Sequence, residues 1–141
     1  SRVNAPASAA GCAAGQRVAD AARLLAVRAM PSDRPVPAED ETRHRIDGDW
    51  GETPAAWTLD SNSLVRPDDA GAIIVTGSHG GLLGGKPETA IRVDAYAAVY
   101  NDAGGGIDEA GFSRLPALDT RAIAAATVDA FSARIGDGRS T

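Results

Sequence analysis

The 141-residue chain has few of the residues that most often reveal a function in a sequence. It contains one cysteine, two histidines and one lysine, and aromatic residues make up only 4% of it. Cys12 has no partner for a disulfide within the chain, which favours a reducing compartment. The scarcity of aromatic residues predicts a core built mostly from Ala, Val, Ile and Leu side chains.

An excess of positive charge is also missing, since the formal net charge is −5. This balance argues against a nucleic-acid partner and against an anionic membrane surface, because both need clustered basic side chains. No apolar run approaches the roughly 20 residues that span a bilayer. We therefore expect a cytoplasmic protein that binds a small molecule, with a homo- or hetero-oligomer left open.

The remaining composition is that of a folded protein, with 43% hydrophobic and 23% charged residues. Residues 1–14 are small and lack periodicity, so they are predicted to be a flexible lead-in. Residues 15–141 are predicted to form a single domain. Its segment 31–63 is rich in proline and should be irregular, with at most one or two short strands. There, Arg43, His44 and Arg45 form a small basic group that is typical of a solvated face.

From residue 64 the pattern of apolar residues becomes regular. Apolar runs predict strands at 72–76 and 96–100, and a strand or a helix at 122–128. Helices are predicted over residues 15–30, near Pro87 and over 108–118. The tail 136–141 is predicted to be disordered unless it folds back over the sheet edge. This alternation predicts a three-layer α/β domain with a short, mainly parallel β-sheet, in a flavodoxin-like or Rossmann-like arrangement.

Two glycine-rich polar clusters follow two of the predicted strands directly. They are Gly77-Ser78-His79-Gly80-Gly81 and Asn101-Asp102-Ala103-Gly104-Gly105-Gly106. Ligands of open α/β sheets bind outside the carboxyl ends of the strands, and glycine lets the backbone approach a ligand closely. The two clusters therefore predict a ligand site formed by loops 77–86 and 101–107.

Within this site, His79 is the predicted general acid or base, because imidazole can exchange a proton near neutral pH. Asp102 would orient it or act as a second base. Further ligand contacts are assigned to the hydrogen-bond donors Ser78 and Asn101 and to the backbone amides of Gly80, Gly81, Gly104 and Gly105. The alternative is that both clusters are ordinary turns, since Asn, Asp and Gly are the residues that loops prefer.

No cofactor or metal is expected from the sequence. The glycine spacings match neither nucleotide-binding fingerprint, and His44, His79 and Cys12 share no ligand spacing. The leading hypothesis is an enzyme acting on a small anionic carbonyl compound by cofactor-independent, hydrolase-like or proton-transfer chemistry. The alternative is a non-catalytic subunit or small-molecule-binding module of a larger complex, with Trp50 and Trp57 as interface anchors.

Overall fold

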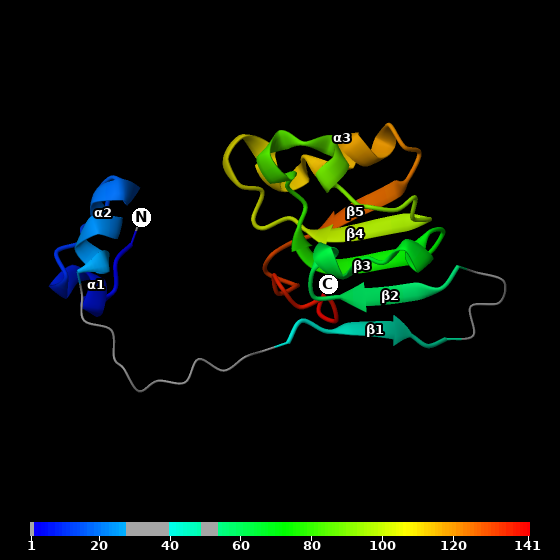
Figure 1. Cartoon of the computed structure of the whole chain (residues 1–141), viewed down its shortest axis with the longest axis horizontal. Helices are drawn as coiled ribbons and strands as arrows, with labels where there is room; N and C mark the ends of the chain where they lie inside the picture. Colours follow the sequence, from blue (N-terminus) through cyan, green and yellow to red (C-terminus); the bar gives the residue numbers. More distant parts are fainter. Residues whose placement is uncertain (1, 28–39, 49–53) are drawn as a thin grey trace. The chain divides into compact units, whose positions relative to one another are not determined.

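The computed structural model describes residues 2–27, 40–48 and 54–141, which belong to two compact units (Figure 1). Unit 1 spans Ser1–Ala38 and unit 2 spans Glu39–Thr141. The boundary between the units therefore differs from the predicted one, which separated residues 1–14 from a domain starting at residue 15. Trp50 lies outside the described residues.

Unit 1 contains two helices, α1 (Ala5–Ala9) and α2 (Val18–Ala26). Helix α2 agrees with the helix predicted over residues 15–30, whereas α1 forms where a flexible lead-in was expected. The reason for α1 is local: the Asn4 side chain accepts a hydrogen bond from the Ala7 amide at 3.0 Å, and Pro6 lies in the first turn. Cys12 follows α1 and is buried.

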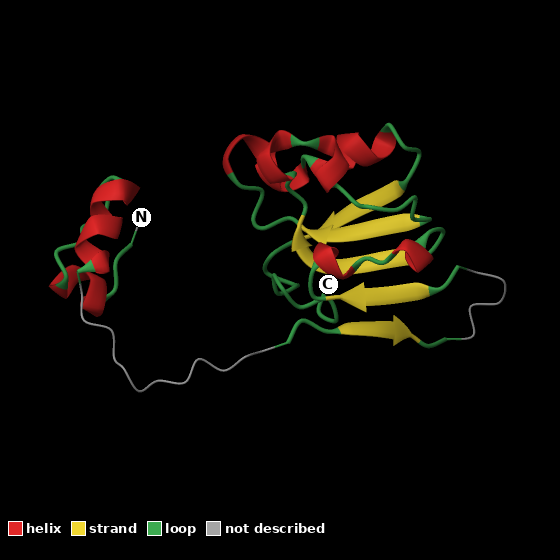
Figure 2. Cartoon of the chain, viewed as in Figure 1, coloured by secondary structure: helices red, strands yellow, loops and turns green. Residues whose placement is uncertain are grey.

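Unit 2 is built on a five-stranded sheet (Figure 2). Its strands are β1 (Arg43–Ile46), β2 (Ala56–Leu59), β3 (Ile73–His79), β4 (Ala97–Asn101) and β5 (Ala124–Val128). Strand β1 is antiparallel to β2, and the other neighbouring pairs are parallel. The predicted α/β fold with a short, mainly parallel sheet is confirmed. The strands lie in sequence order, without the reversal of order that flavodoxin-like and Rossmann-like sheets contain.

Short helical segments connect the strands. In the described ranges they are the α-helix α3 (Arg114–Asp119) and five 3₁₀ turns: η1 (Asn62–Leu64), η2 (Pro67–Asp69), η3 (Leu83–Gly85), η4 (Pro87–Thr89) and η5 (Ile107–Phe112). The helix predicted over 108–118 is thus divided into η5 and α3. Asp108 and Glu109 adopt positive φ, a left-handed conformation that interrupts a regular helix.

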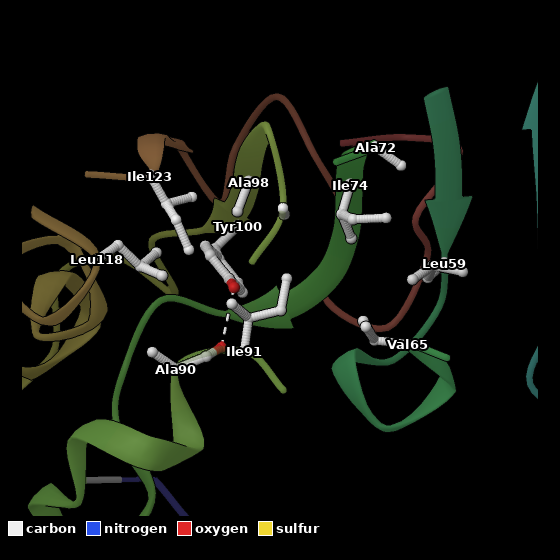
Figure 3. Packing of buried hydrophobic residues seen from close by; sticks show 11 residues of the cluster. Leu59, Val65, Ala72, Ile74, Ala90, Ile91, Ala98, Tyr100, Leu118 and Ile123 are labelled. Carbon is white, nitrogen blue, oxygen red and sulfur yellow. Dashed lines mark hydrogen bonds between the residues drawn. The ribbon is translucent and has the colours of Figure 1, made fainter. Parts of the chain in front are cut away.

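The core of unit 2 lies against one face of the sheet (Figure 3). Ile74, Ala98 and Tyr100 point to this face and are fully buried, with Leu118 of α3 packed among them. The Tyr100 hydroxyl donates a hydrogen bond of 2.9 Å to the Ala90 carbonyl, so the one aromatic ring at the centre of the core leaves no polar atom unpaired. The remaining core side chains are aliphatic, as the composition predicts.

The C-terminal tail packs against the carboxyl ends of β2 and β3. The Gly136 amide donates to the Gly77 carbonyl at 2.7 Å, and the Gly138 amide donates to Oδ1 of Asp60 at 3.1 Å. A Cβ on Gly77 would overlap the backbone of Asp137, and one on Gly138 would overlap the backbone of Leu59. The tail therefore folds back over the sheet edge, which was the less favoured of the two predictions.

Candidate functional site

A polar cavity of about 270 Å³ lies where β2 and β3 end. Nine residues line it: Ser61, Asn62, Ser63, Ser78, His79, Leu83, Thr89, Arg92 and Arg114. Two of them, Ser78 and His79, are residues that the sequence predicts for the site. Among the described residues, this lining contains two cations, no carboxylate and a single apolar side chain, Leu83, so it suits a polar, negatively charged ligand.

Arg114 is the most unusual of these residues because its charge is buried. The residue is 2% exposed, and its guanidinium lies over the Tyr100 ring at 4.8 Å. Nε donates to the Gly81 carbonyl at 3.0 Å and Nη1 donates to the Ala90 carbonyl at 2.7 Å. Within the described part of the chain, no carboxylate forms an ion pair with Arg114. A buried cation without a counter-charge is costly, so an anion in the cavity would be strongly favoured.

The same environment affects Tyr100. Burial raises the pKa of its hydroxyl, and the nearby charge of Arg114 partly opposes that rise. The hydroxyl therefore stays protonated at neutral pH, as its hydrogen bond to the Ala90 carbonyl requires. Tyr100 and Arg114 thus share one carbonyl acceptor, which holds the guanidinium in place beside the cavity.

Arg92 adds a second positive charge at the exposed edge of the cavity. It also lacks an ion pair with any carboxylate in the described ranges. Arg121 shows the contrasting, structural use of this side chain: it pairs with Asp94 at 2.7 Å and donates to the carbonyls of Ile91 and Val93. Arg92 is therefore available to a ligand.

Ser78 ties the end of β3 to η1. Its Oγ accepts a hydrogen bond from the Asn62 amide at 2.8 Å, and its own amide donates to Oγ1 of Thr76. The Ser78 hydroxyl hydrogen remains free to donate. The Asn62 side chain is also uncommitted, because its Oδ1 is buried without any hydrogen-bond partner in the described structure. Buried polar atoms without a hydrogen-bond partner are rare in folded proteins, so the presence of one here needs an explanation.

His79 is exposed at the rim of the cavity, and its ring orientation is fixed by its own loop. Nδ1 accepts a hydrogen bond from the Gly81 amide at 3.1 Å. In the neutral ring the proton is therefore on Nε2. His79 thus offers the cavity an N–H donor.

Asp102 and Asn101 do not line the cavity. Oδ1 of Asp102 accepts hydrogen bonds from the Gly104 amide at 2.7 Å and the Ala130 amide at 3.0 Å. Asn101 is fully buried, and its Nδ2 donates to the Ala133 carbonyl at 2.9 Å. The structure aligns His79 with Asn101 in neighbouring strands, as predicted, but it gives His79 no hydrogen bond to Asp102. The Asp102 carboxylate turns back to its own loop, which is the usual behaviour of aspartate in turns.

The four glycine amides predicted to hold an anion are already hydrogen-bonded. The amide of Gly80 donates to the Asn101 carbonyl, Gly81 to His79 Nδ1, Gly104 to Asp102 Oδ1, and Gly105 to the Asp102 carbonyl. Close packing, and not anion binding, explains why residues 80 and 81 are glycines. A Cβ on Gly80 would overlap the Gly111 carbonyl, and one on Gly81 would lie 2.7 Å from the Ala110 carbonyl. Any anion bound here would thus depend on the arginines.

Sequence analysis did not find the two arginines or Asn62. For Arg114 a signal was present, since residue 114 lies four positions before Leu118, on the apolar side of the predicted helix 108–118. A charged residue at such a position is expected to be either paired or functional. For Arg92 and Asn62, which come from irregular segments, no periodic pattern exists that could mark them.

A larger hollow of about 530 Å³ belongs to unit 1, where mainly apolar side chains around Cys12 line it. Its lining includes one charged residue, Arg2, and no histidine or carboxylate. Among all the described residues, no cluster of three or more His, Cys, Asp or Glu side chains could hold a metal ion. None of the described helices is long and apolar enough to cross a membrane. Of these two hollows, the cavity of unit 2 has more polar side chains in its lining and is therefore the candidate site.

Comparison of the chain with protein-family models, with curated proteins and with solved structures finds no match.

Proposed function

We propose that unit 2 binds a small molecule carrying an oxyanion, a carboxylate or a phosphate, in the cavity at the ends of β2 and β3. The observation that carries this proposal is the Arg114 guanidinium, which is buried at the cavity wall without a carboxylate partner among the described residues. An oxyanion would supply the missing counter-charge, and arginine is suited to it because its planar N–H groups match two oxygens at once.

The proposed role is that of a small-molecule-binding module, the alternative that the sequence left open. Hydrolase-like or proton-transfer catalysis by His79 stays a prediction. Its Nδ1 is engaged by the Gly81 amide, and the Asp102 carboxylate expected to orient the ring is bound to its own loop. In this geometry His79 is better suited to donate a hydrogen bond to the ligand than to remove a proton from it.

Binding can be tested with inorganic phosphate and acetate as probes, measured by calorimetry on the full chain. Arg92 is the residue to change first, because it is exposed and its loss should leave the fold intact. We expect Arg92→Gln to weaken binding about tenfold, since a hydrogen bond between charged groups contributes about 1.5–3 kcal/mol. Arg45→Gln is the matched control, because Arg45 is exposed on β1 and does not line the cavity.

Equal affinities of wild type and Arg92→Gln, or equal losses in Arg92→Gln and Arg45→Gln, would contradict the proposal. In the second case the effect would come from overall charge and not from the cavity. Absence of binding by either anion to the wild type would also reject it.

A further inference from the structure

The cavity has two chemically different sides, which lie next to different strands of the sheet. Arg114 is held over Tyr100, a residue of β4, so the cationic side lies toward β4. Ser61, Asn62 and Ser63 follow β2, so they form the side toward β2. Strand β3, which contributes Ser78 and His79, lies between β2 and β4. A ligand that fills the cavity must therefore match a positive side and a neutral side.

On the neutral side the uncommitted groups both donate and accept hydrogen bonds. In the described structure the Ser78 oxygen accepts from the Asn62 amide, and its hydrogen has no acceptor. The Asn62 carboxamide has a buried acceptor oxygen without a partner among the described residues, so it meets a ligand hydroxyl once the side chain turns into the cavity. The neighbouring hydroxyls of Ser61 and Ser63 bind each other at 2.8 Å, and the Ser63 hydroxyl also donates to Oε2 of Glu41 at 3.3 Å. An alcohol is the natural complement of a free hydroxyl and a free carboxamide, because one O–H group can donate to an oxygen and accept from a donor.

From these two sides we propose that the ligand is a small hydroxylated oxyanion: a hydroxy acid or the phosphate monoester of a small polyol. This inference rests on the proposed oxyanion site and adds the hydroxyl groups to it. The oxyanion lies toward Arg92 and Arg114, and the hydroxyls lie toward Asn62 and Ser78.

The lining also argues against two other classes of ligand. It contains no aromatic side chain and only one apolar one, Leu83, so a nucleobase or another flat apolar group would find no surface to stack on. No carboxylate is among the described lining residues, so the ammonium group of an amino acid would find no opposite charge in the cavity wall. A neutral hydroxyl avoids both conflicts.

Two matched pairs of probes test the inference on the full chain by calorimetry. Glycerol 3-phosphate is compared with propyl phosphate, and glycerate is compared with propionate. Each pair shares its anion and its number of carbon atoms and differs only in the hydroxyls. We expect the hydroxylated member of at least one pair to bind ten or more times more tightly than its partner.

Variants then assign the preference to the neutral side. Asn62→Ala should reduce the ratio of affinities within that pair to about one. It should leave the urea midpoint unchanged, because the Asn62 side chain forms no hydrogen bond with any other described residue. Arg92→Gln is the control inside the same cavity: it should weaken both members alike and keep the ratio.

The possible outcomes separate the two proposals. If both members of each pair bind equally well, the oxyanion site stands and the hydroxyl inference is overturned. If the hydroxylated member is preferred but Asn62→Ala keeps the ratio, the hydroxyls are recognised elsewhere and the inference is overturned as well. If none of the four probes binds, the proposed function itself fails.

Discussion

Arg43 and Asp69 form the best-defined ion pair of unit 2, in a region where the sequence predicts only a solvated basic group. Two hydrogen bonds of 2.7 and 2.6 Å join the guanidinium to the carboxylate, which is 1% exposed. The guanidinium also lies over the Trp57 ring at 3.8 Å. Trp57 was expected as an interface anchor in the binding-module hypothesis, and here it packs within its own unit. The alternation of charged residues along β1 gave no indication of this partner.

Removing the charge of Asp69 should destabilise unit 2. In Asp69→Asn the Arg43 side chain, which is 11% exposed, loses its counter-charge, and breaking such a largely buried pair costs about 3 kcal/mol of unfolding free energy. Urea denaturation measures this loss. Asp94→Asn is the control, because the Asp94 side chain is 86% exposed in its pair with Arg121 and its removal should cost less than about 1 kcal/mol. Equal losses in the two variants would mean that burial of the Arg43 pair adds nothing.

The same pair predicts how stability depends on pH. The hydrogen bond from Arg43 lowers the pKa of Asp69, with the Arg66 amide and the charge of Arg43 adding to the effect. A lowered pKa in the folded state means that the carboxylate stabilises the fold fully above its unfolded pKa of about 3.9. This contribution is lost as the pH falls through the lower, folded value. Urea unfolding of the wild type should thus weaken steeply below about pH 4, and Asp69→Asn should show a shallower slope there. Parallel curves would contradict the assignment to Asp69.

Among the elements, the parallel strands were the part most readily predicted. Runs such as Ile73–Val75 and Ala97–Val99 are continuous apolar segments, which is the pattern of strands covered on both sides. Strand β1 was harder, because an edge strand with Arg43 and Arg45 has no apolar run. In the candidate site, Ser78 and His79 could be predicted because they belong to the glycine-rich cluster that follows the predicted strand 72–76; in the structure they are the last two residues of β3. Arg114 could not be assigned a role, since the carbonyls that hold it come from residues 81 and 90.

The loop 80–81 and the turn at 110–111 approach so closely that glycine is required. We expect Gly80→Ala to lower the unfolding free energy by about 2–3 kcal/mol, because its Cβ would overlap the Gly111 carbonyl. Gly84→Ala is the matched control. It has positive φ but open space around the added Cβ, so its cost should be about 1 kcal/mol from backbone strain alone. Urea denaturation measures the unfolding free energy of both variants. Equal losses would show that loop 80–81 shifts to accommodate the added Cβ without loss of packing.

On the scale of the whole molecule, the core of unit 2 is self-contained. The described residues of its buried cluster, which extends from Leu59 to Ile123, all belong to unit 2. A chain shortened to residues 40–141 should therefore unfold cooperatively in urea, with a free energy within about 0.5 kcal/mol of the same transition in the full chain. It should also keep the phosphate affinity of the full chain. A lower midpoint or a loss of cooperativity in the shortened chain would show that unit 1 supports unit 2.

The sequential order of the strands also has a kinetic meaning. Each of β2 to β5 lies beside the strand that precedes it in the chain, so the sheet can grow by adding one strand at a time in the order of synthesis. The tail is the exception. Its Gly138 amide must reach back across 78 residues to Asp60, and closing so long a loop is the slowest kind of contact to gain by local growth. The side chain of Asp60, at the end of β2, therefore joins a segment that is made late to a strand that is made early.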